Sequence, residues 1–301
     1  MMQKLPFGAT GLEVSPLGIG ATDRLEVIEL MLDSGTNLVD TAQVYGEHEV
    51  FLGECLSHRR DQFILVSKCG HHDILADGTM RSREISMDDI DRALKRLRTD
   101  HLDAMLLHSY DRDRLEAGDA VAVLARARQA GKIRFAGYSG DNDRAAIAAG
   151  MQDLDILETS ISIADQSNID HALPIARDRG VGVIAKRPVA NAAWRYLAEP
   201  PQTYGKHKVA PYVERLKVMG LDLPALGFED SPAGWSELAV RFNLSVPGLH
   251  CSIIATRQAG HARDNLAAAA RGPLPRSTYD TIRRAFAEAE KARGERWLGE
   301  N

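Results

Sequence analysis

Four titratable side chains of the kinds used in acid–base catalysis occur in order along the first part of the chain: Asp40, Tyr45, Lys68 and His108. Asp40, Lys68 and His108 each end a short apolar run, and Tyr45 follows the first of these runs by five residues. Each residue taken singly has an ordinary structural interpretation, as a cap, a packed ring or a polar strand end. A chemical interpretation therefore depends on whether the fold brings the four together.

The elements that would position them are short runs rich in Val, Ile or Leu without strict alternation, as expected for strands buried on both faces. These eight runs cover 17–20, 37–40, 63–68, 103–108, 134–139, 155–159, 182–186 and 251–255. Helical patterns lie between them: those at 24–34, 113–130 and 167–179 stop at a glycine, and the one at 86–98 begins with Ser-Met-Asp-Asp, an N-cap with acidic first-turn residues. The alternation predicts an α/β fold, and eight units favour a closed (β/α)8 TIM barrel over an open doubly wound sheet.

Two further segments complete the expected architecture. Residues 4–14 read as an N-terminal β-hairpin with a glycine-rich turn, and a long loop follows strand seven over 190–231, with a helix at 210–219. The charged pattern at 276–291 predicts a solvated amphipathic helix. We expect one barrel domain over residues 1–301.

A barrel collects its reactive groups at the carboxyl ends of the strands. Asp40, Lys68 and His108 end three consecutive predicted strands, and Tyr45 lies just beyond the first of them. Because neighbouring strands are about 4.8 Å apart, the four side chains can converge at that end.

Composition narrows the function classes. The 301 residues include 37 basic and 42 acidic side chains, for a net charge of −5, which argues against nucleic acid or an anionic membrane as the main partner. The sequence shows neither a long apolar span nor a signal-peptide pattern, so we expect a cytoplasmic protein. The three scattered cysteines predict reduced thiols and no metal site.

The chain resembles the aldo-keto reductases. The resemblance is carried by the motif Asp-Thr-Ala-Gln-Val-Tyr-Gly at 40–46, by the Lys68 and His108 strands and by the Gly-Tyr-Ser segment at 137–139. It implies an oxidoreductase that reduces an aldehyde or ketone, including a keto-sugar or natural-product carbonyl, with a nicotinamide cofactor. Tyr45 would be the general acid, Lys68 would lower its pKa, Asp40 would orient Lys68, and His108 would donate to the carbonyl oxygen.

The resemblance also implies the cofactor site. Ser139 would hold the nicotinamide amide, Thr256 and Arg257 an adenosine 2′-phosphate, and Asn265 the adenine. Because Arg257 is the remaining fixed cation of its stretch, NADP(H) is favoured over NAD(H). Gly140, Glu158 and Lys186 depart from the family's usual Asn, Gln and aromatic residue. The full expected set is Gly20, Ala21, Asp40, Ser139, Gly140, Glu158, Lys186, Arg187, Pro188, Val189, Thr256, Arg257, His261, Asp264 and Asn265.

The substrate pocket is expected to include Tyr45 and His108, with Trp194 and Tyr196 from the long loop as apolar walls and Tyr204 or Trp235 as further candidates. Packing is the competing interpretation of these aromatic residues. Two other functions stay open: an aldolase or isomerase with Lys68 as Schiff-base nucleophile, and a non-catalytic nucleotide-binding barrel that acts as a sensor or partner subunit. The expected ligand is a small carbonyl compound, and the sequence leaves the oligomeric state open.

Overall fold

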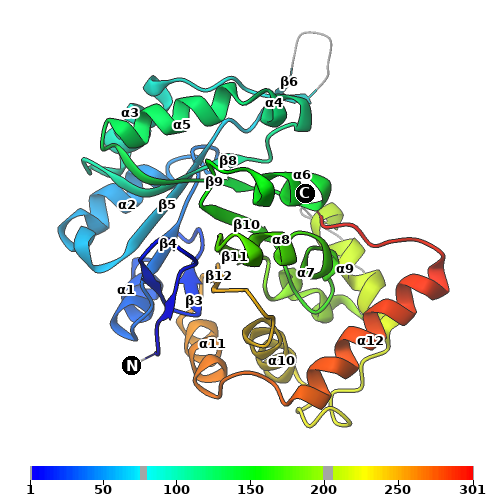
Figure 1. The fold of residues 1–301 in the computed structure, drawn as a ribbon. Helices are drawn as coiled ribbons and strands as arrows, with labels where there is room; N and C mark the ends of the chain where they lie inside the picture. Colours follow the sequence, from blue (N-terminus) through cyan, green and yellow to red (C-terminus); the bar gives the residue numbers. More distant parts are fainter. Residues whose placement is uncertain (1, 75–79, 199–205, 301) are drawn as a thin grey trace.

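The eight apolar runs form a closed barrel of parallel strands in the computed structural model, which describes residues 2–74, 80–198 and 206–300 (Figure 1). Its strands are β3 (Leu17–Ile19), β4 (Leu38–Asp40), β5 (Ile64–Cys69), β8 (Leu102–His108), β9 (Ile133–Ser139), β10 (Ile156–Ser160), β11 (Gly182–Lys186) and β12 (Cys251–Ile254). Each strand pairs with its neighbours in chain order, and β12 pairs with β3 to close the ring. The predicted (β/α)8 barrel is confirmed, with strand bounds within about a residue of those expected.

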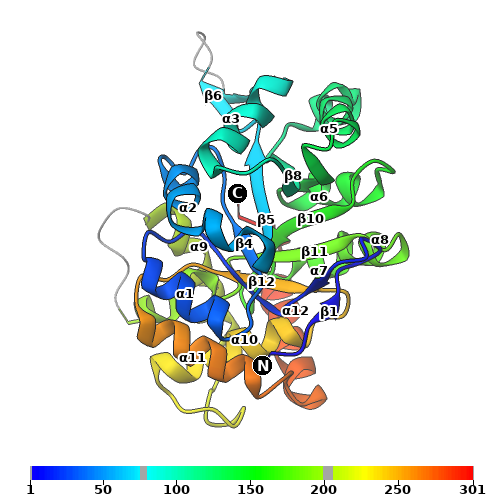
Figure 2. The same cartoon turned by 90° about the vertical axis from the view of Figure 1, so that its left-hand side faces the viewer.

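Helices surround this barrel on its outside, as the two perpendicular views show (Figures 1 and 2). They are α1 (Leu25–Asp33), α2 (His48–Leu56), α3 (Met87–Leu97), α4 (Arg112–Ala117), α5 (Asp119–Gln129), α6 (Asn142–Gly150), α7 (Ser167–His171), α8 (Leu173–Asp178), α9 (Lys206–Met219), α10 (Pro232–Leu244), α11 (Ala259–Ala270) and α12 (Arg276–Arg293), with short 3-10 helices η1 (Ser57–Gln62) and η2 (Ala190–Tyr196). Two stretches expected as single helices are each broken in two. Gly118 takes a left-handed φ of 82° between α4 and α5, and Pro174, which lacks an N–H, lies at the start of α8.

The predicted N-terminal hairpin, β1 (Leu5–Pro6) with β2 (Glu13–Val14), closes the end of the barrel at which the strands begin, here called the lower end. Phe7 and Val14 are fully buried and belong to the core cluster inside the barrel. A Cβ on Gly182 of β11 would come within 2.8 Å of the Phe7 ring, so this glycine leaves the room that the ring occupies. The barrel interior is therefore a packed core below its carboxyl end.

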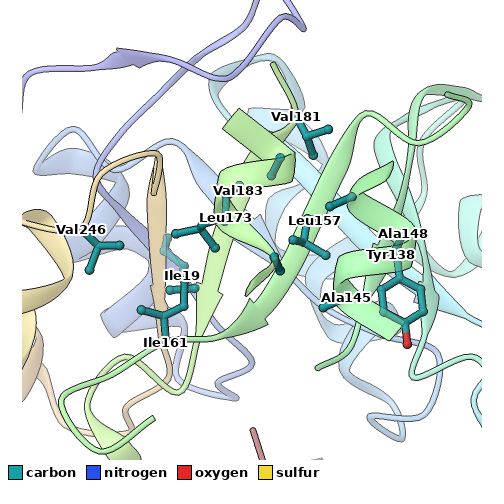
Figure 3. Close-up of a cluster of buried hydrophobic side chains, with 14 of the residues drawn as sticks. Ile19, Tyr138, Ala145, Ala148, Leu157, Ile161, Leu173, Val181, Val183 and Val246 are labelled. Atoms are coloured by element: carbon teal, nitrogen blue, oxygen red, sulfur yellow. The ribbon is translucent and has the colours of Figure 1, made fainter. Parts of the chain in front are cut away.

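A larger core fills the space between the strands and the helices. Figure 3 shows part of it, where Leu157 of β10 and Val183 of β11 lie with Ala145 of α6 among the labelled side chains. The helix α12 contributes a buried face, with Tyr279, Ile282, Phe286 and Ala289, so this predicted amphipathic helix is only partly solvated.

Alternation along the strands decides which residues reach the carboxyl end of the interior. In β5, Ile64 and Val66 belong to the interior core, whereas Leu65 and Cys69 pack outward against the helices. Lys68 continues the inward series, as Asp40 does after Leu38 and Glu158 does after Ile156. The top layer of the interior is therefore polar and charged while the layers beneath it are apolar.

Two segments depart from the expected pattern. A second hairpin, β6 (His72–Ile74) with β7 (Met80–Ser82), follows β5 and was not predicted. In the long connection after β11, the helix expected at 210–219 begins earlier, as α9 at Lys206. None of the helices within the described residues is long and apolar enough to cross a membrane.

Candidate active site

The floor of the site is a buried lysine between two carboxylates. Lys68 Nζ lies 2.5 and 2.6 Å from the two carboxylate oxygens of Asp40 and 3.1 Å from the Thr41 carbonyl oxygen. Glu158 Oε2 lies 3.3 Å from the same nitrogen. Desolvation opposes the charge on Lys68, but the two carboxylates outweigh it and raise the lysine's pKa, so Lys68 stays protonated.

The pKa of Asp40 is raised as well, which for a carboxyl group disfavours the charged form. Burial and the neighbouring Glu158 carboxylate raise the pKa of Asp40 well above its usual range, although Lys68 opposes this. Glu158 is held from its other side by Ser139, whose Oγ donates to Glu158 Oε1 at 3.0 Å. The floor thus links β4, β5, β9 and β10 through charged and polar contacts.

A cavity of about 930 Å³ opens above this floor, and Tyr45 and His108 both line it together with Asp40 and Glu158. The Tyr45 and His108 rings meet edge to face, with centroids 6.0 Å apart. Lys68 Nζ lies 5.4 Å from the Tyr45 ring centroid. The structure therefore brings the four titratable residues singled out in the sequence to one place.

Tyr45 keeps its proton at neutral pH. Lys68 is the largest single influence on its pKa and lowers it, but burial and the Asp40 and Glu158 carboxylates together raise the pKa above its usual value. Lys68 thus acts in the expected direction, but the pKa of Tyr45 is not lowered overall, because two carboxylates and desolvation oppose the lysine.

His108 is uncharged. Burial, Lys68 and the neighbouring His71 lower the pKa of His108 to about 2. The His71 ring stacks on it, with centroids 4.5 Å apart and planes 22° apart. His108 Nδ1 is buried without a hydrogen-bond partner among the described residues. A neutral imidazole at the cavity wall can donate one hydrogen bond to an oxygen without bringing in a charge.

The helix after the Tyr45 loop fixes the geometry of this wall. Glu49 of α2 is fully buried, accepts from Ser67 Oγ at 2.7 Å and pairs with Arg96 Nε at 3.1 Å. A Cβ on Gly53 would meet the Arg96 backbone, so only a glycine lets α2 approach α3 this closely. The residues around Tyr45 therefore anchor its loop to β5 and α3.

A comparison with known families gives the identity. The model described as "Aldo/keto reductase family" matches residues 4–287. The chain belongs to the aldo/keto reductase family. It is thereby an oxidoreductase of carbonyl compounds, in a family that uses a nicotinamide cofactor.

Individual aldo/keto reductases are similar at lower identity. The chain is 29% identical over 220 residues to the NADH-specific methylglyoxal reductase of Escherichia coli strain K12. The match covers 62% of this chain and 68% of that protein. It is 26% identical over 201 residues to the aldo-keto reductase YhdN of Bacillus subtilis strain 168, over 60% of each chain. The holo form of the aldo-keto reductase AKR11C1 from Bacillus halodurans superposes with a TM-score of 0.76 over 95% of this chain and 96% of that one, at 22% identity. This last likeness shows the shared fold.

Eight of the fifteen cofactor residues expected for this aldo/keto reductase line the cavity: Gly20, Ala21, Asp40, Glu158, Lys186, Arg187, Pro188 and Val189. Lys186 stands where an aromatic ring was expected from the family, and its Nζ pairs at 2.8 Å with the buried Asp141. Arg187 Nη1 donates to Ser160 Oγ at 3.2 Å. Both cations are thus held by groups at the ends of β9 and β10.

Ser139 and Gly140 lie at the end of β9, where the Ser139 hydroxyl donates its hydrogen bond to Glu158. A Cβ on Gly140 would collide with the Tyr138 ring, and the Gly140 N–H donates to the Glu158 carbonyl oxygen at 3.0 Å. The asparagine that the family often has at this position is therefore excluded unless the Tyr138 ring moves.

The residues expected to hold the adenosine end lie around the start of α11, outside the lining of the main cavity. Arg257 is exposed and pairs with Asp23 at 2.8 Å, and it borders a neighbouring pocket that Tyr45 also lines. Asn265 is buried, and its Oδ1 accepts from Ser236 Oγ at 2.8 Å. Thr256 is half-buried, and His261 and Asp264 are exposed on the same turn.

The aromatic residues expected as pocket walls lie elsewhere. Trp194 of η2 is buried in the core and stacks on Trp235 of α10, with ring centroids 6.0 Å apart. Tyr196 packs against the same core and does not line the described part of the cavity. Tyr204 falls outside the described residues.

Sequence reasoning missed several residues of the cavity wall. They are Val44, His71, His72, Ser109, Arg144, Asn191, Ala192, Ile253, Ile254 and Ala255. The signal available for His71, His72 and Ser109 was their position directly beyond the carboxyl ends of β5 and β8. Most of the missed side chains on the β5 and β8 side of the wall are polar.

Proposed function

We propose that this aldo/keto reductase reduces a small, polar aldehyde or ketone to an alcohol, with Tyr45 as proton donor and with NADPH preferred to NADH. The observation that carries the proposal is the joint placement of Tyr45 and His108 on one cavity above the Lys68–Asp40 pair. The bound nicotinamide would supply the hydride, and the residues of the chain would bind the carbonyl and provide the proton.

Proton donation fits the charges of the site. Tyr45 holds its proton at neutral pH because its pKa is raised, so it is ready to act as an acid. When the proton leaves, the Lys68 cation 5.4 Å from the ring centroid stabilises the phenolate. Neutral His108 would hydrogen-bond the carbonyl oxygen and fix its position beside Tyr45.

The protonated state of Lys68 argues against the aldolase alternative. A Schiff base requires a neutral amine as nucleophile, whereas the carboxylates around Lys68 raise its pKa and its three N–H groups are directed at Asp40 and the Thr41 carbonyl.

The residues of the cavity fit a nicotinamide cofactor. Glu158 lines the cavity, and its buried Oε2 accepts no hydrogen bond from the described residues, so this carboxylate has an acceptor left for a carboxamide NH2. Arg257 supports the preference for NADPH, because a guanidinium can grip a 2′-phosphate through two N–H groups. The Escherichia coli relative is named as NADH-specific, so NADH is the competing choice.

Polar side chains on the wall favour a small oxygen-rich substrate. His71, His72, Ser109 and Arg144 border the cavity on the side of His108. His72 contacts Asp111 and Arg144 donates to the Ser109 carbonyl oxygen, so this wall is a polar network that suits hydroxyl or further carbonyl groups. We therefore expect glyceraldehyde to be a better substrate than benzaldehyde, as judged by kcat/KM.

The test combines binding and turnover. Calorimetric titration of the purified protein with NADPH and NADH should show binding of both with NADPH tighter. Tyr45→Phe should then lower kcat by about 10²–10⁴-fold while cofactor affinity is kept. Tyr279→Phe removes the same hydroxyl from a ring on α12 stacked against Phe242, and should leave kcat unchanged. Unchanged turnover in Tyr45→Phe would remove Tyr45 from the acid role.

A further inference from the structure

We propose that Glu158 makes this cavity bind the oxidised, positively charged form of the nicotinamide cofactor in preference to the reduced, uncharged form. The inference rests on the proposed function, because it presumes that a nicotinamide occupies the cavity. It assigns Glu158 a role in setting the redox preference of the site, beyond that of a hydrogen-bond acceptor.

The hydrogen bonds of Lys68 leave none for Glu158. An ammonium group has three N–H donors, and those of Lys68 are taken by the two Asp40 oxygens and the Thr41 carbonyl. Glu158 Oε2 lies 3.3 Å from Lys68 Nζ, yet it receives no hydrogen bond from the described residues. Glu158 is thus attracted by a cation that is already committed to another carboxylate.

Counting the charges shows a surplus at the floor. Two carboxylates, Asp40 and Glu158, share one cation, Lys68. The next cation, Lys186, pairs at 2.8 Å with Asp141, which is fully buried. His108 adds no positive charge, since its pKa is lowered to about 2. The floor therefore carries one negative charge more than its cations balance when both carboxylates are ionised.

Other groups that face the pair do not remove this surplus. Cys251 of β12 contributes a neutral thiol, because burial and the two carboxylates raise its pKa. Tyr45 contributes a neutral phenol above the floor. Arg187, at the end of β11, keeps its charge, but the carboxylates on which that charge acts are Asp141 and Asp165. A proton taken up by Asp40, whose pKa is raised, is the remaining way to neutralise the pair.

A surplus carboxylate distinguishes the two forms of the cofactor by charge alone. The oxidised nicotinamide ring is a cation and the reduced ring is neutral, so the attraction acts on one form only. Contacts to the rest of the cofactor are common to both forms and cancel in the ratio of their affinities. An interaction of the size that shifts a pKa by one unit changes that ratio about tenfold.

This preference would assist reduction of a carbonyl. Tighter binding of the oxidised form makes the bound reduced form a stronger hydride donor. For a two-electron couple, a tenfold preference lowers the potential of the bound cofactor by about 30 mV.

The experiment measures four dissociation constants by calorimetry at pH 8.5, for oxidised and reduced NADP with the wild-type protein and with Glu158→Gln. The amide has the shape of the carboxylate without its charge. We expect the preference for the oxidised form to fall about tenfold in Glu158→Gln. Glu237→Gln, which removes a carboxylate paired with arginines on the outside of the barrel, should leave the ratio unchanged.

Wild-type protein supplies a measurement independent of any variant. Its preference for the oxidised form should be smaller at pH 5.5 than at pH 8.5, because a proton taken up by Asp40, whose pKa is raised, cancels the surplus. An unchanged ratio in Glu158→Gln, or a wild-type ratio independent of pH, would overturn the inference and leave the proposed function standing. Failure of the wild-type protein to bind either form would overturn the proposed function itself.

Discussion

Replacing Lys68 by methionine tests the electrostatics of the floor directly. The side chain is fully buried, and its Nζ is the cation nearest to two carboxylates, with Asp40 at 2.6 Å and Glu158 at 3.3 Å. Methionine fills similar space without the charge, so both carboxylates would be left buried and uncompensated. Breaking a buried ion pair by removing one partner costs about 3–5 kcal/mol of unfolding free energy.

The loss should depend on pH in a defined direction. Without Lys68 the folded-state pKa of Asp40, which burial and the Glu158 carboxylate already raise, rises further above its unfolded value near 4. Below the unfolded pKa both states are protonated and the penalty vanishes, whereas above the raised folded pKa the penalty is complete. Lys68 itself, with its raised pKa, stabilises the wild-type fold throughout this range. The deficit of Lys68→Met should therefore grow as pH increases.

Urea unfolding followed by far-ultraviolet circular dichroism at pH 5.5, 7 and 8.5 would measure this deficit. Lys132→Met provides the matched control, since it removes a half-buried surface lysine paired with Asp91, and should cost less than about 1 kcal/mol at every pH. The double variant Lys68→Met with Glu158→Gln should recover part of the loss, because one uncompensated carboxylate remains in place of two. A deficit below about 1 kcal/mol, or one that is the same at all three pH values, would refute the charge count at the floor.

Three further outcomes follow from contacts elsewhere in the molecule. Asp23→Ala frees Arg257 from its exposed ion pair and should tighten NADPH binding by up to about fivefold without changing NADH binding, as seen by titration; a gain common to both would mean that Arg257 does not contact the 2′-phosphate. Asp103→Asn weakens a buried carboxylate that bridges Arg60 and Arg134, and should lower the unfolding free energy by about 3 kcal/mol in urea; a loss near zero would show that the bridge is dispensable. Gly140→Ala should destabilise the fold by about 1–3 kcal/mol in the same assay, because its Cβ meets the Tyr138 ring, and an unchanged midpoint would show that the ring yields freely.

The barrel was predictable from the sequence because its strands are apolar on both faces and helices with glycine stops separate them. The break between α4 and α5 was not, because an isolated glycine inside a helical pattern is often tolerated and only the packing shows that Gly118 turns left-handed. The hairpin of β6 and β7 escaped notice because its two strands are three residues each and contain His, Asp, Arg and Ser.

The floor of the site was predictable residue by residue, but its charge was not. Asp40 and Lys68 could be placed at strand ends, and Glu158 could be noted as a departure from the family. The contact between Glu158 and Lys68 depends on the inward alternation of β10 and β5 across the barrel, which pairwise strand order does not reveal. The role of Trp194 could not be predicted either. Its stacking partner Trp235 lies on another helix, and no local sequence pattern indicates that the two rings meet.

The N-terminal hairpin determines from which side water can exchange protons with the buried charged groups of the site. Phe7 and Val14 fill the lower end of the barrel, so solvent reaches Lys68 and the carboxylates beside it from the carboxyl end. Any molecule that fills the mouth of the cavity then slows isotope exchange at the floor, although no part of the protein has moved. The lifetime of the complex with that molecule would then limit the rate of proton exchange at Lys68 and the carboxylates, without any conformational change of the barrel.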